Sequence, residues 1–284
     1  MATIEATLKS AQEQLKQAGL VDSPQIDAEL LLCYTLQVNR SYFFTWPEKE
    51  LSAGQEQIFQ TLLQKRLQGH PIAHIIEQRE FWGLDLKVSK DTLIPRPDTE
   101  TLIEAVLDLN CFNRLDSNCA ILDLGTGSGA IALALKSELT DCQITAVDQS
   151  LAALEIAKQN AIKNQLNVTF LESDWFSAVK NQHYHCIVSN PPYIEDNDPH
   201  LKQGDVRFEP ISALTSGKDG LDDIRLIIHQ AWSHLHAQGW LLIEHGYNQA
   251  DNINKLFEKQ GYKNIRLCKD LGGNPRITLG QKPQ

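Results

Sequence analysis

The chain has 284 residues, of which 42% are hydrophobic and 22% charged, as in an ordinary globular protein with room for about two domains. Its net charge of -10 argues against nucleic acid or an anionic membrane as a direct partner. No stretch approaches about 18 apolar residues, and Glu5 and Glu13 stand where a secretory signal would be basic and then apolar. Six cysteines without framework spacing indicate reduced thiols, so we expect a cytoplasmic protein.

Apolar residues recur three and four positions apart through residues 1–75, which predicts amphipathic helices. Ser23, followed by Pro24, and Ser52 have the residue types that start helices, and Gly19 and Gly69 can end them. We therefore expect a small all-α domain over 1–75.

Residues 76–95 have a different pattern. The alternation in "EFWGLDLKVS" predicts a hairpin, and "IPRPD" is typical of a stiff connector, so the domain boundary is expected here. In the following "RPDTE", Asp98 or Thr99 is expected to cap a helix, and Arg96 is a candidate to lie over a cofactor.

Residues 96–284 alternate helical segments with short apolar runs, a pattern that predicts right-handed crossovers and a mainly parallel sheet. The last two runs have no helix between them and indicate an antiparallel edge hairpin. The fold class is thus α/β, with a Rossmann-like, seven-stranded sheet after the small all-α domain. The runs lie at 119–125, 143–148, 168–173, 184–190, 239–246, 265–268 and 276–280.

The first of these runs leads into a glycine turn, "ILDLGTGSGAIALAL". Glycines let the backbone turn tightly and let a ligand lie against it. About twenty residues later Asp148 ends the next run, where a carboxylate can take both hydroxyls of a ribose. The pair predicts a nucleoside site, although Ala130 also completes a dinucleotide fingerprint and leaves NAD possible. The cofactor-binding candidates in the turn are Gly125, Thr126, Gly127, Ser128 and Gly129.

Two features favour S-adenosylmethionine. Asp123 places a carboxylate beside the glycine turn, which suits a cationic ligand and would repel a pyrophosphate. Asp174 and Trp175 end the third run, where one can hydrogen-bond an adenine amino group and the other can stack on the ring. Trp175 could equally be a core aromatic.

The fourth run ends in "NPPY", comprising Asn190, Pro191, Pro192 and Tyr193. Consecutive prolines fix φ and remove two backbone donors, so this turn holds Asn190 and Tyr193 rigidly at the ligand-binding edge of the sheet. A plain turn is the alternative. The later stretches "RFEP" and "GKDGLDD" could form a lid or substrate wall, or an exposed loop. The histidines of "HYHC" and "HLHAQGWLLIEHG" have no organised third ligand, so no metal site is expected.

The ordered motifs "LIPRPDTE", "DLGTGSGAIAL", "NPPYI", "FEPISAL", "GKDGL" and "KDLGGNPRIT" resemble the protein-glutamine N5-methyltransferases that modify peptide chain release factors. The resemblance implies S-adenosylmethionine as cofactor and class I release factors as partners, methylated at the glutamine of their Gly-Gly-Gln loop. The helical domain over 1–75 agrees with that family's layout and would recognise the substrate. One departure is Asp98, where the family commonly has Glu.

The chemistry of a primary amide then suggests a role for "NPPY". Its nitrogen is a poor nucleophile, and ordinary side chains cannot deprotonate it, so the site must position it. The Asn190 side-chain oxygen and the Pro191 carbonyl can accept from both N–H groups, while Tyr193 packs over the amide. These residues are the catalytic and, with Pro192, the substrate-binding candidates. An adenine N6-methyltransferase, a noncatalytic docking module and an NAD oxidoreductase remain alternatives, and we expect a monomer.

Overall fold

The computed structural model describes residues 2–19, 23–109 and 119–284, which form two compact units. One unit contains residues 1–78 and 199–208, and the other contains 79–198 and 209–284. Cys111 lies outside the described residues. None of the described cysteines is in a disulfide, as the prediction of reduced thiols requires. Among the described residues, no helix has the length and apolar content needed to cross a bilayer.

The helical unit is built around a core that includes Leu31 and Phe59, both fully buried. The predicted helix boundaries are largely confirmed: Gly19 ends the first helix in a left-handed conformation, and Ser52 starts the fourth in a reciprocal capping box with Gln55. Ser23 precedes its helix but makes no side-chain cap bond. The helices are α1 (Ile4–Ala18), α2 (Pro24–Leu36), α3 (Ser41–Thr45), α4 (Ala53–Leu67) and α5 (Ile72–Ile76).

Residues 199–208 form two short 3₁₀ turns, η3 (Pro199–Lys202) and η4 (Asp205–Phe208), that belong to the helical unit. The guanidinium of Arg66, 8% exposed, contacts Asp27 at 2.7 Å and Asp205 at 3.2 Å. The His70 and Phe208 rings lie 4.5 Å apart. A segment just after "NPPY" is therefore fixed by the helices at the start of the chain.

The second unit begins with the predicted hairpin, β1 (Gln78–Phe81) and β2 (Leu84–Lys87). Its main sheet has seven strands in the order β5-β4-β3-β6-β7-β9-β8, parallel except for β9, which is antiparallel to both neighbours. The predicted fold class, including the antiparallel edge, is confirmed. The strands are β3 (Ala120–Leu124), β4 (Gln143–Asp148), β5 (Thr169–Glu172), β6 (Tyr184–Ser189), β7 (Leu235–Glu244), β8 (Lys263–Lys269) and β9 (Pro275–Gln281).

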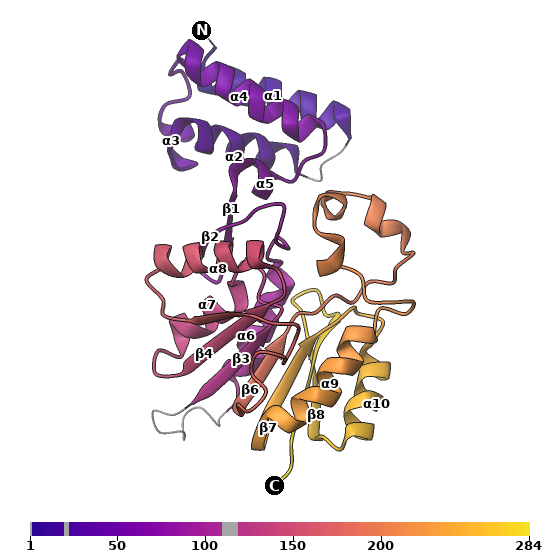
Figure 1. Ribbon diagram of the computed structural model, residues 1–284. Coiled ribbons are helices and arrows are strands. Elements are labelled where there is room, and N and C mark those ends of the chain that lie inside the picture. Colours follow the sequence, from indigo (N-terminus) through magenta and orange to yellow (C-terminus); the bar gives the residue numbers. More distant parts are fainter. Residues whose placement is uncertain (1, 20–22, 110–118) are drawn as a thin grey trace. The chain divides into compact units, whose positions relative to one another are not determined.

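Helices cover both faces of this sheet (Figure 1). Neighbouring residues of one strand point to opposite cores: Ile121 packs with the helices on one face, and Leu122 with those on the other. Burial on both faces explains why the strands read as continuous apolar runs. The helices are α6 (Glu100–Leu107), α7 (Ala130–Glu138) and α8 (Leu151–Lys163) on one face, and α9 (Asp222–His234) and α10 (Ala250–Gln260) on the other.

The strand order reverses between β3 and β6, because the chain passes outward through β4 and β5 before returning to the other side of β3. In doubly wound sheets such a reversal opens a crevice at the carboxyl ends of the strands, where ligands bind. The glycine turn follows β3 and "NPPY" follows β6, so the topology brings the two motifs to this crevice.

Candidate active site

A cleft of about 560 Å³ occupies this edge of the sheet, within the second unit. That volume is in the range of small-molecule sites. Of the predicted residues, Asp123, Gly129, Pro191 and Tyr193 are not part of its lining. Those that line it are Gly125, Thr126, Gly127, Ser128, Asp148, Asp174, Trp175, Asn190 and Pro192.

The glycine turn is bent over β4. The amides of Gly125 and Thr126 both donate to the Val147 carbonyl at 2.9 Å. Gly127 and Gly129 have φ of +56° and +84°, which side chains rarely adopt. A Cβ at Gly129 would also lie 3.2 Å from the Ala157 Cβ, so this glycine serves close helix packing and not the cleft.

Asp148 stands at the end of β4 and faces the cleft. One carboxylate oxygen accepts from the Gly127 amide and the other from the Ser150 amide, each at 2.8 Å. Burial raises the pKa of Asp148 above its usual value. A carboxylate has about four lone-pair sites, so these backbone amides hold Asp148 in place and leave it able to accept from a ligand hydroxyl.

Asp123 lies beneath the glycine turn and is fully buried. Its Oδ2 accepts from the Thr126 hydroxyl at 2.6 Å, whereas its Oδ1 has no hydrogen-bond partner among the described residues. Burial raises the pKa of Asp123 from 3.8 to about 7. A buried carboxylate with an unsatisfied oxygen beside a ligand cleft suits a cationic group, which would restore its ionisation.

Asp174 and Trp175 both line the cleft after β5, as their position in the sequence predicts. Trp175 has a φ of +46°, and its carbonyl accepts from the Ser173 hydroxyl at 2.7 Å. Its ring lies beside Gly125, 3.6 Å from where a Cβ would stand. Trp175 also packs against the core, so both interpretations of this residue hold in part.

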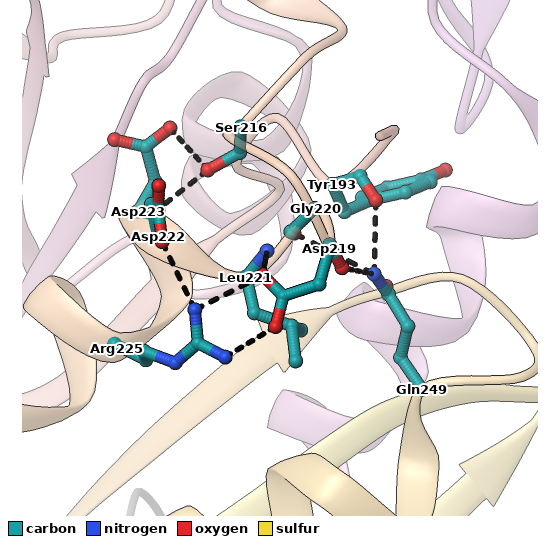
Figure 2. Close-up of polar contacts among 9 residues, drawn as sticks. All are labelled: Tyr193, Ser216, Asp219, Gly220, Leu221, Asp222, Asp223, Arg225 and Gln249. Carbon is teal, nitrogen blue, oxygen red and sulfur yellow. Dashed lines mark hydrogen bonds and ion pairs between the residues drawn. The ribbon is translucent and has the colours of Figure 1, made fainter. Parts of the chain in front are cut away.

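The "NPPY" backbone is anchored from two sides. The amides of Tyr193 and Ile194 donate to the Leu214 carbonyl at 3.1 and 2.8 Å. On the other side, Gln249 Nε2 donates to the Tyr193 carbonyl at 2.9 Å (Figure 2). Gly220 of the "GKDGL" stretch packs so closely that a Cβ there would lie 2.2 Å from that carbonyl oxygen. This stretch therefore supports the "NPPY" turn from behind.

The "GKDGL" stretch is itself fixed at its ends, as Figure 2 shows. The Ser216 hydroxyl donates to the Asp223 carboxylate at 2.7 Å and accepts from the Asp223 amide at 2.8 Å. Arg225 pairs with Asp219 at 2.5 Å. Neither alternative describes this stretch alone: Lys218 and Asp219 are exposed, as in a surface loop, whereas Gly220 and Leu221 are buried.

A buried carboxylate, Glu244, lies next to the Tyr193 side chain of "NPPY", and the sequence patterns did not predict it as a site residue. Asn190 Nδ2 donates to the Thr99 hydroxyl at 3.2 Å. The Tyr193 hydroxyl lies 3.5 Å from Oε1 of Glu244, at the end of β7. Burial and the Glu244 charge raise the pKa of Tyr193 above its usual range, so the phenol stays protonated. Glu244 could have been noticed only as the polar end of the run "GWLLIE".

Residues 96–99 differ from the prediction. A 3₁₀ turn, η1 (Pro97–Thr99), precedes α6, and neither predicted side chain caps the helix. Asp98 pairs with Arg276 at 3.1 Å instead, and the Thr99 hydroxyl is taken by Asn190. The capping prediction is wrong because both side chains have stronger partners across the fold. Arg96 does line the cleft, paired with buried Glu209.

The doubly wound sheet with its antiparallel edge, the glycine turn, the strand-tip acids and the "NPPY" turn define the class of protein: an S-adenosylmethionine-dependent methyltransferase of class I. The hMettl16 catalytic domain, solved in complex with an RNA hairpin, shares the fold with a TM-score of 0.55 and 19% identity over 72% of this chain and 76% of its own.

Sequence comparisons are more specific. Residues 6–76 match the PrmC N-terminal domain, and residues 101–205 match the methyltransferase small domain. Release factor glutamine methyltransferases of Shewanella oneidensis and Vibrio cholerae are 49% and 50% identical to this chain, over 93% and 98% of it and 91% and 96% of their own lengths. The chain belongs to the family of release factor glutamine methyltransferases.

Proposed function

We propose that this chain transfers a methyl group from S-adenosylmethionine to the side-chain amide nitrogen, N5, of the glutamine in the Gly-Gly-Gln loop of class I peptide chain release factors. Such a reaction would support translation termination. The single observation that carries the proposal is the orientation of Asn190. Its Nδ2 is bound to Thr99, so its Oδ1 remains to accept from an amide in the cleft.

The residues of the cleft fit the cofactor. Asp148 would bind the ribose hydroxyls, and Asp174 and Trp175 would hold the adenine. The unsatisfied Oδ1 of Asp123 would face the cationic end of the ligand across the glycine turn. Bound in this way, S-adenosylmethionine supplies an electrophilic methyl group on a sulfonium.

The acceptor residues would then work by position. Asn190 Oδ1 would accept from one amide N–H in the cleft, and we assign the other N–H to the carbonyl of Pro191, which belongs to the same turn but not to the cleft lining, so that the nitrogen lone pair is aimed at the methyl carbon. Methyl transfer would form the N–C bond as the C–S bond of the donor breaks, and the cationic nitrogen that results would release one proton to solvent as the product leaves. The prolines keep both acceptors in place, and Tyr193 and Pro192 exclude water from the amide.

Methylation of purified release factor by the purified chain tests the proposal, with mass spectrometry locating the methyl group. Asn190→Ala should lose about 3 kcal/mol of transition-state stabilisation, roughly a hundredfold in turnover, with a smaller effect on cofactor affinity. Asn252→Ala, at an exposed position of α10, is the matched control and should behave as the wild type. The two hydrogen-bond acceptors, Asn190 Oδ1 and the Pro191 carbonyl, are here called the acceptor clamp. Near-normal turnover by Asn190→Ala would refute this clamp. Methyl transfer to an adenine base instead of glutamine would favour the nucleic-acid alternative.

We assign substrate recognition to the helical unit. One glutamine side chain offers too little surface to distinguish a release factor, so a wider interface is needed. In support, Phe44 and Trp46 of this unit are 80% and 55% exposed. A chain beginning near Phe81 is an ambiguous test, because it also removes the partners of Asp205 and Phe208. Point substitutions of the exposed aromatics are cleaner.

We further propose that the enzyme acts as a cytoplasmic monomer without direct contact to nucleic acid. The net charge of -10 supports this, since an enzyme that extrudes bases from a duplex needs a basic groove. Size-exclusion chromatography with light scattering tests the monomer. Tight, salt-dependent binding of DNA or RNA would contradict the proposed lack of contact with nucleic acid.

A further inference from the structure

Glu244 lies at the same end of the sheet as the "NPPY" turn, here called the acceptor turn. Strands β6 and β7 pair in parallel with Ser189 opposite Ile243, which brings the next residue of each strand, Asn190 and Glu244, to the same end of the sheet. Glu244 is 1% exposed, and its Oε2 has no hydrogen-bond partner among the described residues. A buried carboxylate with an open lone pair is costly, which points to a use for it.

Thr99 connects this carboxylate to Asn190. A hydroxyl has one proton to donate and lone pairs to accept with. The Thr99 oxygen accepts from Asn190 Nδ2, so its proton is left to donate, and hydrogen bonding from Thr99 lowers the pKa of Glu244. The Thr99 proton and the open Oε2 of Glu244 are a matching donor and acceptor, so the three side chains would form a relay in which the carboxylate receives the proton of Thr99 and Thr99 receives that of Asn190.

The direction of this relay decides which end of the Asn190 amide faces the cleft. The two ends of an asparagine amide have nearly the same shape, and only hydrogen bonding distinguishes them. With an ionised Glu244, Thr99 must donate to the carboxylate and therefore accept from Nδ2. A neutral Glu244 can instead donate to Thr99, whose proton can then point to Asn190 and draw its oxygen away from the cleft.

The charges around Glu244 are few. Arg276 of β9 faces it and lowers its pKa, while Asp98 of η1, itself paired with Arg276, raises it. Tyr193 approaches from the acceptor turn and stays protonated. Burial outweighs these contributions and raises the pKa of Glu244 from 4.5 to about 7. The carboxylate therefore changes charge near neutral pH, with the ionised form present above that pH.

We propose that Glu244 is a positioning residue for methyl transfer: through Thr99 it fixes the Asn190 amide with its oxygen toward the substrate. This inference rests on the proposed role of Asn190 as the acceptor clamp. Glu244 itself touches neither substrate nor cofactor, and it acts only through the two side chains between it and the glutamine amide.

The matched pair Thr99→Val and Thr99→Ser tests the relay on intact release factor with saturating S-adenosylmethionine. Valine keeps the shape of threonine and removes the hydroxyl, so kcat should fall about ten- to a hundredfold, as for other outer partners of a functional group. The Thr99→Ser variant keeps a hydroxyl and should retain most of the wild-type kcat. Cofactor affinity and the melting temperature should change little in either variant. A Thr99→Val variant with wild-type kcat would overturn the proposal.

Glu244→Gln supplies the second readout. The wild-type kcat should rise with pH through about 7, because the active form is ionised, and the variant should be slower and lose this rise. An unchanged rate and pH profile would also overturn the relay. Asn190→Ala separates the two levels of the argument. If it keeps near-normal turnover, the clamp itself fails; if it is inactive while Thr99→Val is normal, only the positioning role fails.

Discussion

Gly220→Ala tests whether the "GKDGL" stretch holds the acceptor turn. The added Cβ would lie 2.2 Å from the Tyr193 carbonyl oxygen and 2.9 Å from Gln249 Nε2, against about 3.5 Å for an ordinary contact. The turn must therefore shift by about 1 Å. The φ of +68° costs about 1–2 kcal/mol with a side chain, and weakening the Gln249 bond adds about 1 kcal/mol. We expect a loss of about 2–3 kcal/mol in the free energy of unfolding.

The effect on activity should be larger than the effect on stability. A displacement of about 1 Å at positioned groups can lower turnover about a hundredfold. Urea unfolding and steady-state methylation of release factor measure the two quantities. Gly83→Ala is the control, because Gly83 has a φ of +71° and open space where its Cβ would stand. It should lose only the conformational part and keep its turnover. If both variants lost the same stability and both turned over normally, the proposed support of Tyr193 would be refuted.

Three further predictions follow from the cleft and the helical unit. Asp148→Ala should weaken S-adenosylmethionine and S-adenosylhomocysteine equally, by about 1.5–3 kcal/mol in calorimetry, and unchanged affinities would place the ribose elsewhere. The raised pKa of Asp123 means that the folded state binds its proton more tightly, so stability falls as pH rises from about 4 to 7. Asp123→Asn should flatten this fall, gaining at most about 4 kcal/mol above pH 7 in urea unfolding, whereas equal changes at pH 5 and 8 would contradict the titration. Replacing Phe44 and Trp46 with Ser should raise the KM for intact release factor about tenfold or more, but leave a short Gly-Gly-Gln peptide unaffected, and an unchanged KM would move recognition away from these side chains.

The parts of the site that follow strand ends could be predicted from the sequence. Gly127, Asp148 and Asn190 each stand next to an apolar run, and parallel strands bring their carboxyl ends to one edge. The supporting residues could not be predicted in the same way. Glu244 and Asn190 come to the same end of the sheet only because β6 and β7 pair in one register, and Gln249 reaches Tyr193 across 56 positions of sequence. Such pairings depend on the whole sheet.

The wrong prediction for Asp98 and Thr99 has the same origin. Local capping signals describe what a side chain does without better partners. Here Arg276 and Asn190, both distant in sequence, take these two side chains. The assignment of residues 199–208 to the helical unit depends likewise on Arg66 and Asp205, which lie 139 positions apart.

The membership of residues 199–208 in the helical unit means that the backbone passes between the two units three times, near residues 78, 198 and 208. A single linker lets a domain be lost, exchanged or moved to another gene by one recombination event. A domain joined to the other by three crossings cannot be separated by one such event. If a protease cut the chain after residue 78, the helices of residues 1–78 would lose their covalent link to the rest. They would still pack against residues 199–208 of the other fragment. We therefore expect the two units to be inherited together.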